Sequence, residues 1–163
     1  KVCVVKDQFG FLLHHRVMQK ETDDQIAVPL IKETKERFPQ LISCTFDKGF
    51  HSPDNQKDLA VLLDKVILPR KGKLSAINKE IENSEEFKEA RRKHSAIESS
   101  INALENHGLD RCPDHGIHGF KRYVGLAIVA RNIQILGHIL QQKQLQRLQR
   151  LERRQGRPLR AVL

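Results

Sequence analysis

The strongest constraint on this chain is the order of its hydrophobic patterns, in which short β-rich runs alternate with amphipathic helical ones. Runs with strand character occur at residues 2–5, 10–18, 41–46 and 66–68. The first two are joined by a short connector containing Asp7 and Gly10, which is typical of a hairpin. Helical periodicity separates the later runs, at 22–38 and 52–64. A hairpin followed by alternating helices and strands predicts an α/β sheet domain.

Two long helices are predicted after the last strand, at about residues 84–106 and 117–140. The first has an apolar stripe spaced by three and four residues, formed by Phe87, Ala90, His94, Ile97, Ile101 and Leu104. The second is rich in apolar residues, so we predict that it lies in the core, with Asn132 hydrogen-bonded within it. The polar stretch 70–83 predicts an irregular loop.

The net charge of +9 is distributed unevenly along the chain. Residues 141–163 carry seven lysines and arginines against one acid, Glu152, so we divide the chain into a domain, 1–140, and a basic helical tail, 141–163. Such a tail suits nucleic acid, although a solvated helix end without a partner has the same composition. The three cysteines imply no disulfide framework and fit a reducing cytoplasm. No uninterrupted apolar run approaches the roughly 20 residues of a membrane span, so no membrane partner is predicted.

Two carboxylates stand at positions where metal chemistry is common. Asp47 follows the predicted strand 41–46 and precedes Gly49, which permits a sharp turn at the carboxyl end of that strand. Glu98 lies in the long helix beside its apolar stripe, where a helix can direct a carboxylate along a sheet edge. A turn-forming Asp and a surface Glu are the competing interpretations.

As a pair, Asp47 and Glu98 suit Mg²⁺, which binds few protein oxygens and keeps waters for a substrate phosphate. Two-metal sites activate a water or a 3′-hydroxyl and stabilise the leaving oxygen. This chemistry needs at least one further carboxylate. The chain contains no Gly-rich phosphate loop and no nucleotide-binding fingerprint.

Several separated blocks resemble DDE-type insertion-sequence transposases in the same order. Ser43–Ser52 is similar to their second-Asp motif and Arg91–Glu105 to their third-acid helix. The flanking blocks resemble the ISNCY-type group, at Asp7–Phe11, His15–Met18, Gly108–Cys112 and Ala130–Asn132. The resemblance covers nearly the whole chain up to Leu140.

This resemblance implies an RNase H-like fold, incomplete because its first strand is absent, followed by long C-terminal helices. Asp47 would be the second catalytic acid and Glu98 the third, holding Mg²⁺ or Mn²⁺, and the first acid would lie before Lys1. Asp7 is a poor substitute because it sits in the hairpin turn, and Asp23 resembles a non-catalytic acid that opens the first helix. We therefore expect a fragment that is inactive by itself.

The implied activity is metal-dependent cleavage of DNA and strand transfer, with transposon ends and target DNA as partners. A homodimer and a bacterial, cytoplasmic, nucleoid-associated location are also implied. An inactive DNA-binding remnant and a cellular RNase H-like nuclease are the alternatives. Related groups often carry Arg and Lys where this chain has His94 and Glu105. The candidate DNA contacts are Lys48, His51, Lys71, Arg91, Arg92, His94, Arg147, Arg150, Arg153 and Arg154.

A second cluster, His107, Cys112, His115 and His118, has a spacing that zinc could accept. It lacks the paired spacing of common structural zinc sites, so a plain interhelical loop is the favoured interpretation.

Overall fold

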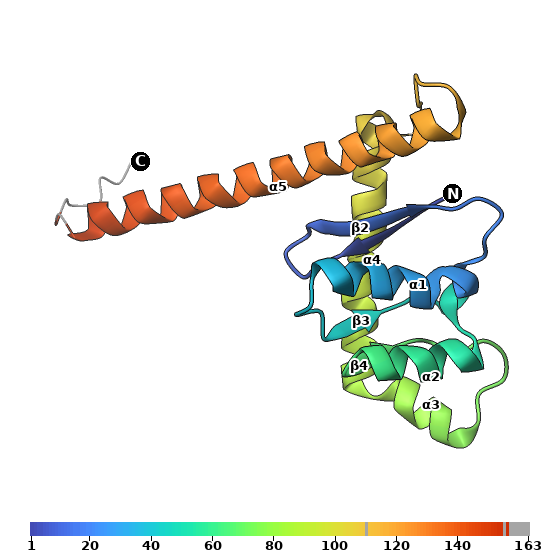
Figure 1. Ribbon diagram of the computed structural model, residues 1–163. Helices are drawn as coiled ribbons and strands as arrows, with labels where there is room; N and C mark the ends of the chain where they lie inside the picture. The colour runs from blue at the N-terminus through green and yellow to red at the C-terminus, as the bar shows by residue number, and fades with distance from the viewer. Residues whose placement is uncertain (110, 155, 157–163) are drawn as a thin grey trace.

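The computed structural model describes residues 1–109, 111–154 and 156, without the side chains of residues 95–100, 107, 108 and 154. The structure contains two small sheets that lie side by side. Helices cover them, and one long helix extends beyond them (Figure 1). The mixture of strands and helices confirms the predicted α/β class.

The first sheet is the predicted hairpin, made of β1 (Val2–Lys6) and β2 (Leu12–Val17) in antiparallel pairing. Asp7 closes the connection between the two strands. Its Oδ1 accepts the backbone N–H groups of Phe9 at 2.9 Å and Phe11 at 2.8 Å. Asp7 is therefore a turn residue, as expected, since short acidic side chains hydrogen-bond the backbone just after them.

The second sheet consists of β3 (Ser43–Thr45) and β4 (Lys65–Ile67), which pair in parallel. The helix α1 (Asp23–Arg37) precedes β3, and α2 (Pro53–Leu62) connects β3 to β4. The capping residue of α2 is Ser52, whose hydroxyl accepts the Asn55 N–H, and Pro53 stands at the first helical position, where a missing N–H costs nothing.

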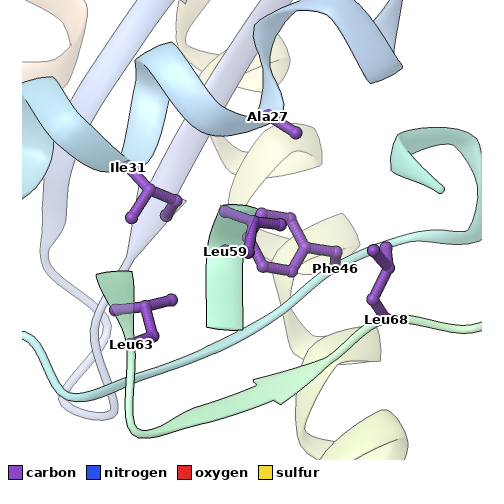
Figure 2. Packing of buried hydrophobic residues seen from close by; sticks show 6 residues of the cluster. All are labelled: Ala27, Ile31, Phe46, Leu59, Leu63 and Leu68. Carbon is purple, nitrogen blue, oxygen red and sulfur yellow. The ribbon is translucent and has the colours of Figure 1, made fainter. Parts of the chain in front are cut away.

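One hydrophobic core holds α1 and α2 against the second sheet, and Figure 2 shows six of its side chains. They are Ala27, Ile31, Phe46, Leu59, Leu63 and Leu68. Ala27, Ile31 and Leu59 are fully buried. Burial of an aliphatic side chain such as Leu59 contributes about 1.5–3 kcal/mol, so this core fixes the second sheet and the turn after β3.

The stretch 70–83 is not an irregular loop throughout, and that prediction was wrong. It contains α3 (Ala76–Asn83), which is capped by the Ser75 hydroxyl accepting the Asn78 N–H at 3.3 Å. The sequence carried this signal, because a serine cap precedes two isoleucines, Ile77 and Ile81, that are spaced by one helical turn.

The predicted long helix is α4 (Glu85–Leu104), which begins after the cap Ser84 and continues into a π-helical turn, η2 (Glu105–Leu109). α4 contacts both strands of the second sheet (Figure 1). Near its start Phe87 is buried, and at its end Leu104 joins a second core. That core consists of Leu12, Leu104, Val124 and Ile128.

The last helix, α5 (Gly116–Arg154), continues without a break through the expected boundary at 140, and the division into two parts stays a prediction. Its expected role as a core helix was wrong. Val124 and Ile128 are buried, but most of the other apolar residues are exposed, among them Leu126, Val129, Ile133 and Leu136. Within the N-terminal part of α5, one face contacts the body through Val124 and Ile128. The C-terminal part of the helix extends past the body (Figure 1).

Asn132 joins α5 to the first sheet, which corrects the prediction that it bonds within its own helix. Its Oδ1 accepts the Leu12 N–H at 2.9 Å, and its Nδ2 donates to the Leu12 carbonyl at 3.0 Å. The amide therefore pairs with β2 as a neighbouring strand would. Residues 116–153 also have the length and hydropathy of a membrane span, a test that core helices pass as well, so the absence of a membrane partner stays a prediction.

The two sheets do not pair with each other within the described residues. A cavity of about 770 Å³ lies between them. Residues 3–9, from β1 and the hairpin connector, line one side, and residues 41–46, from β3 and the preceding loop, line the other. β1 and β3 thus line opposite sides of this cavity.

Candidate functional site

Asp47 stands at the carboxyl end of β3, where the chain turns into the short helix η1 (Lys48–Phe50). The turn is closed by the Phe50 N–H, which donates to the Asp47 carbonyl at 3.1 Å. The Asp47 side chain is 73% exposed, so its carboxylate is open to solvent and to a ligand. This placement agrees with the position expected from the sequence.

A buried asparagine holds this turn in place. The Nδ2 of Asn55 donates to the Phe50 carbonyl at 2.9 Å and to the Asp24 carbonyl at 2.7 Å. Asn55 is 8% exposed, so these hydrogen bonds are shielded from water. One side chain thereby ties the start of α1, the end of η1 and the first turn of α2 together. This role could not be predicted from the sequence, because Asn55 has the local pattern of an ordinary polar helix residue.

α4 brings its own polar residues to the Asp47 turn. The Nε2 of His94 lies 3.0 Å from Oδ1 of Asp47, and the His94 side chain is 17% exposed. Glu98 follows His94 by four residues in α4, so the two positions share one face of the helix. The side chain of Glu98 lies outside the described residues. Its role as an acid partner of Asp47 therefore stays a prediction.

A second carboxylate, Asp23 at the start of α1, lies against the same turn. A Cβ added to Gly49 would come within 2.9 Å of Oδ2 of Asp23, so the glycine permits this close approach. Oδ1 of Asp23 also accepts a hydrogen bond from Nζ of Lys1 at 2.6 Å. The expectation for Asp23 concerned only the opening of α1, since its contact with η1 depends on tertiary packing.

The charges of Asp23 and Asp47 also act on Cys3 in β1. Burial, together with the negative charges of Asp23 and Asp47, raises the pKa of the Cys3 thiol to about 11. Burial likewise raises the pKa of Cys44, on β3, to about 12, with a contribution from Cys3 across the cavity. Asp23, Asp47 and the start of β1 therefore share one electrostatic environment.

Several of the predicted DNA-contacting residues surround this turn. Lys48 is exposed in η1, directly after Asp47. Lys71 is exposed in the loop before α3. The hydrogen bond with Thr22 lowers the pKa of Asp24, and the charge of Lys71 adds to this effect. Arg91 and Arg92 are exposed on α4, one turn before His94. His51 ends η1, and its Nε2 is buried without a hydrogen-bond partner.

The basic residues of the tail lie elsewhere. Arg147, Arg150 and Arg153 are exposed in the last turns of α5, and the side chain of Arg154 is outside the described residues. Figure 1 shows this end of α5 projecting away from the body, at a distance from the elements that carry Asp47. Any DNA that contacts both regions must therefore extend across the molecule.

The histidine- and cysteine-containing loop does not form a ligand cluster in the part of the chain that the structure describes. No three of its His, Cys, Asp and Glu side chains gather there, or anywhere else among the described residues. The Sγ of Cys112 instead lies 3.6 Å from the Asp114 carbonyl, and the side chain of His107 is outside the described residues. The favoured interpretation as a plain interhelical loop agrees with this arrangement.

An exposed carboxylate at a strand end can serve as a ligand for a hard divalent cation. Residues 1–133 match the family model described as the transposase DDE domain. The chain therefore belongs to the transposase DDE domain family, whose members transfer nucleotidyl groups and act on DNA. No curated protein and no solved structure matches the chain. The ISNCY-type grouping stays a prediction.

Proposed function

We propose that the chain forms most of an RNase H-like catalytic domain that cleaves DNA at transposon ends and joins the freed 3′-hydroxyl to target DNA. Asp47 and Glu98 are the two acids that the chain contributes to this reaction. The observation that carries the proposal is the position of Asp47, directly after β3. Its exposed carboxylate contacts His94 of α4, which lies one turn before Glu98.

Mg²⁺ or Mn²⁺ would be held by the carboxylate oxygens of Asp47 and Glu98. The oxygen ligands and the open position of Asp47 suit a hard cation that keeps most of its waters. Such an ion supplies an activated nucleophile and neutralises charge on the scissile phosphate. Within this chain, His94 positions Asp47 through the 3.0 Å contact, and Asn55 fixes the turn that presents it.

The cavity between β1 and β3 supports an RNase H-like sheet. Paired strands lie about 4.8 Å apart, so one extended strand placed between β1 and β3 could pair with both of them. Cys3 on β1 and Cys44 on β3 both line this cavity. A strand between them would end beside Asp47 and can bring the third carboxylate that the chemistry requires. Without that strand we expect the chain to be inactive by itself.

DNA phosphates would contact the basic residues around the Asp47 turn, which are Lys48, His51, Lys71, Arg91, Arg92 and His94. The exposed position of Lys48, Arg91 and Arg92 supports this role. The basic end of α5 would contact DNA at a second place through Arg147, Arg150, Arg153 and Arg154. We expect the protein to act in the bacterial cytoplasm at the nucleoid, and the ISNCY-type group remains our proposed subfamily.

Binding of Mn²⁺ tests the site without requiring activity. We expect the chain to bind Mn²⁺, measured by electron paramagnetic resonance of the free ion, and Asp47→Asn and Glu98→Gln each to weaken that binding. Asp58→Asn is the matched control, since Asp58 is an exposed acid on α2. Equal Mn²⁺ affinity in all four proteins would reject Asp47 and Glu98 as ligands.

Cleavage of labelled transposon-end DNA tests the activity in the transposase that contains this chain together with the first acid of the triad. Asp47→Ala and Glu98→Ala should abolish Mg²⁺-dependent cleavage and leave DNA binding largely intact. Cleavage that persists in both variants would reject the proposal. A protein that binds DNA but never cleaves would be an inactive remnant, and preferential cutting of RNA–DNA hybrids would identify a cellular nuclease.

A further inference from the structure

His94 occupies a position of α4 that the spacing of the helix assigns to its apolar stripe. Other members of this stripe, Phe87 and Leu104, are buried. The His94 side chain is 17% exposed, so its imidazole is directed toward the body of the molecule and away from solvent. A polar ring at such a position costs free energy unless its nitrogen atoms have partners. His94 therefore has a polar role there in addition to packing.

The separation between His94 and Asp47 equals that of two ligands on one metal ion. Nε2 of His94 lies 3.0 Å from Oδ1 of Asp47, which suits a hydrogen bond. Bonds of about 2.1 Å to an octahedral ion, at right angles to each other, also place two donor atoms about 3.0 Å apart. Tetrahedral bonds of that length would place them about 3.4 Å apart. The nitrogen and the oxygen can therefore bind one six-coordinate ion as they stand.

Glu98 occupies the next turn of α4, on the same face as His94. Two ligands four residues apart on one helix can bind a single ion, because their side chains leave the same face one turn apart. Asp47 approaches this face from the turn after β3, and its carboxylate is 73% exposed. His94 also lines the cavity between β1 and β3. An ion bound by these three residues therefore keeps positions for water and for a further carboxylate.

We propose that Nε2 of His94 is a ligand of the ion at Asp47, which makes this a site for a six-coordinate transition-metal ion such as Mn²⁺ in preference to Mg²⁺. Mg²⁺ binds oxygen atoms and releases its waters reluctantly, whereas imidazole nitrogen is a ligand that first-row transition metals accept. In the chain without an ion, the same nitrogen orients Asp47 through the 3.0 Å contact. The ligand roles of Asp47 and Glu98 rest on the proposed function, and His94 adds a nitrogen to them.

A ligand role fits the position of His94 better than contact with a DNA phosphate. The ring is largely covered and its Nε2 lies beside a carboxylate oxygen, which repels a phosphate. Lys48 and Arg91 near the same turn are exposed, so they can reach phosphates without displacing the imidazole from Asp47. The polar residues around the Asp47 turn therefore divide between the ion and the DNA.

Pulsed electron paramagnetic resonance of bound Mn²⁺ detects the nitrogen directly. We expect the spin echo of the whole chain loaded with Mn²⁺ to be modulated by a coordinated nitrogen, and this modulation to change when the histidines carry the heavier nitrogen isotope. His94→Gln should remove the modulation. His138→Gln is the matched control, since it changes an exposed histidine of α5 and should keep the modulation. Absence of the modulation in wild type, or its persistence in His94→Gln, would overturn the proposal.

Competition between Mn²⁺ and Mg²⁺ separates a ligand from a residue that only orients Asp47. Loss of an orienting contact weakens both ions alike, whereas loss of a nitrogen ligand weakens Mn²⁺ more. We expect His94→Gln to raise the dissociation constant of Mn²⁺ about tenfold or more and to leave that of Mg²⁺ nearly unchanged. Circular dichroism checks that the variant is folded. Equal losses for the two ions would reject the ligand role of His94.

Failure of this assignment is distinguishable from failure of the proposed active site. Mn²⁺ binding that depends on Asp47 and Glu98 but shows no nitrogen modulation would reject His94 as a ligand and leave the proposed function intact. Mn²⁺ binding that is independent of Asp47, or no binding at all, would reject both.

Discussion

Replacement of Asn55 by alanine should loosen the turn that presents Asp47 and destabilise the domain. The substitution removes two buried hydrogen bonds, to the Phe50 carbonyl at 2.9 Å and to the Asp24 carbonyl at 2.7 Å. A buried hydrogen bond contributes about 1 kcal/mol net, and more when the partner is left unpaired. We therefore expect a loss of about 2–3 kcal/mol in the free energy of unfolding, or roughly 4–12 °C in Tm for a chain of this size.

Urea unfolding followed by circular dichroism measures this loss, and a related variant makes the test sharper. Asn55→Asp keeps the size of the side chain but places a carboxylate against two carbonyl oxygens. It should therefore be less stable than Asn55→Ala. Asp58→Ala, an exposed change on the same helix, should stay within about 0.5 kcal/mol of wild type. If Asn55→Ala also stayed within that margin, Asn55 would not be the residue that holds the turn.

Three further outcomes follow from other contacts. Gly49→Ala should lower Tm and weaken Mn²⁺ binding, because the new Cβ meets a carboxylate oxygen at 2.9 Å; an unchanged Tm and Mn²⁺ affinity would contradict that crowding. The guanidinium of Arg16 lowers the pKa of Glu21 below its usual 4.5, so the stability from this pair is present above that pH and is lost as the pH falls through the lowered pKa. An NMR titration of Glu21 in Arg16→Gln should show its pKa returning upward, and no change would refute the pairing. Burial raises the pKa of Cys44 to about 12, so iodoacetamide at pH 8 should modify Cys112 well before Cys44, as peptide mass spectrometry can measure; equal rates would contradict the raised pKa of Cys44.

Local signals in the sequence were sufficient for most of the elements. The hairpin with Asp7 in its turn, the helix α2 and the strand that precedes Asp47 all depend on residues close to one another in the chain. Such signals act through backbone preferences and contacts between neighbouring side chains, so they can be recognised without knowledge of the fold. The helix α3 was missed although its serine cap was present in the sequence.

Contacts between distant residues were not predictable in this way. Asn132 pairs with Leu12 across 120 positions, and Asn55 bridges three elements. The approach of Asp23 to Gly49 and of His94 to Asp47 likewise depends on how α1 and α4 pack on the turn after β3. A polar side chain has the same local pattern whether it faces solvent or another element, so only the packed structure distinguishes the two.

The sequence by itself determined the α/β class, the position of Asp47 at a strand end and the uneven distribution of positive charge. Hydrophobic period and turn chemistry are local properties, and they were enough for each of these. The tertiary structure decided which apolar residues of α5 are covered, and it left a cavity between β1 and β3. Both depend on where one element ends relative to another. The hydrophobic pattern of a helix shows which side is apolar, but only the shape of the body shows how far along the helix that side is buried.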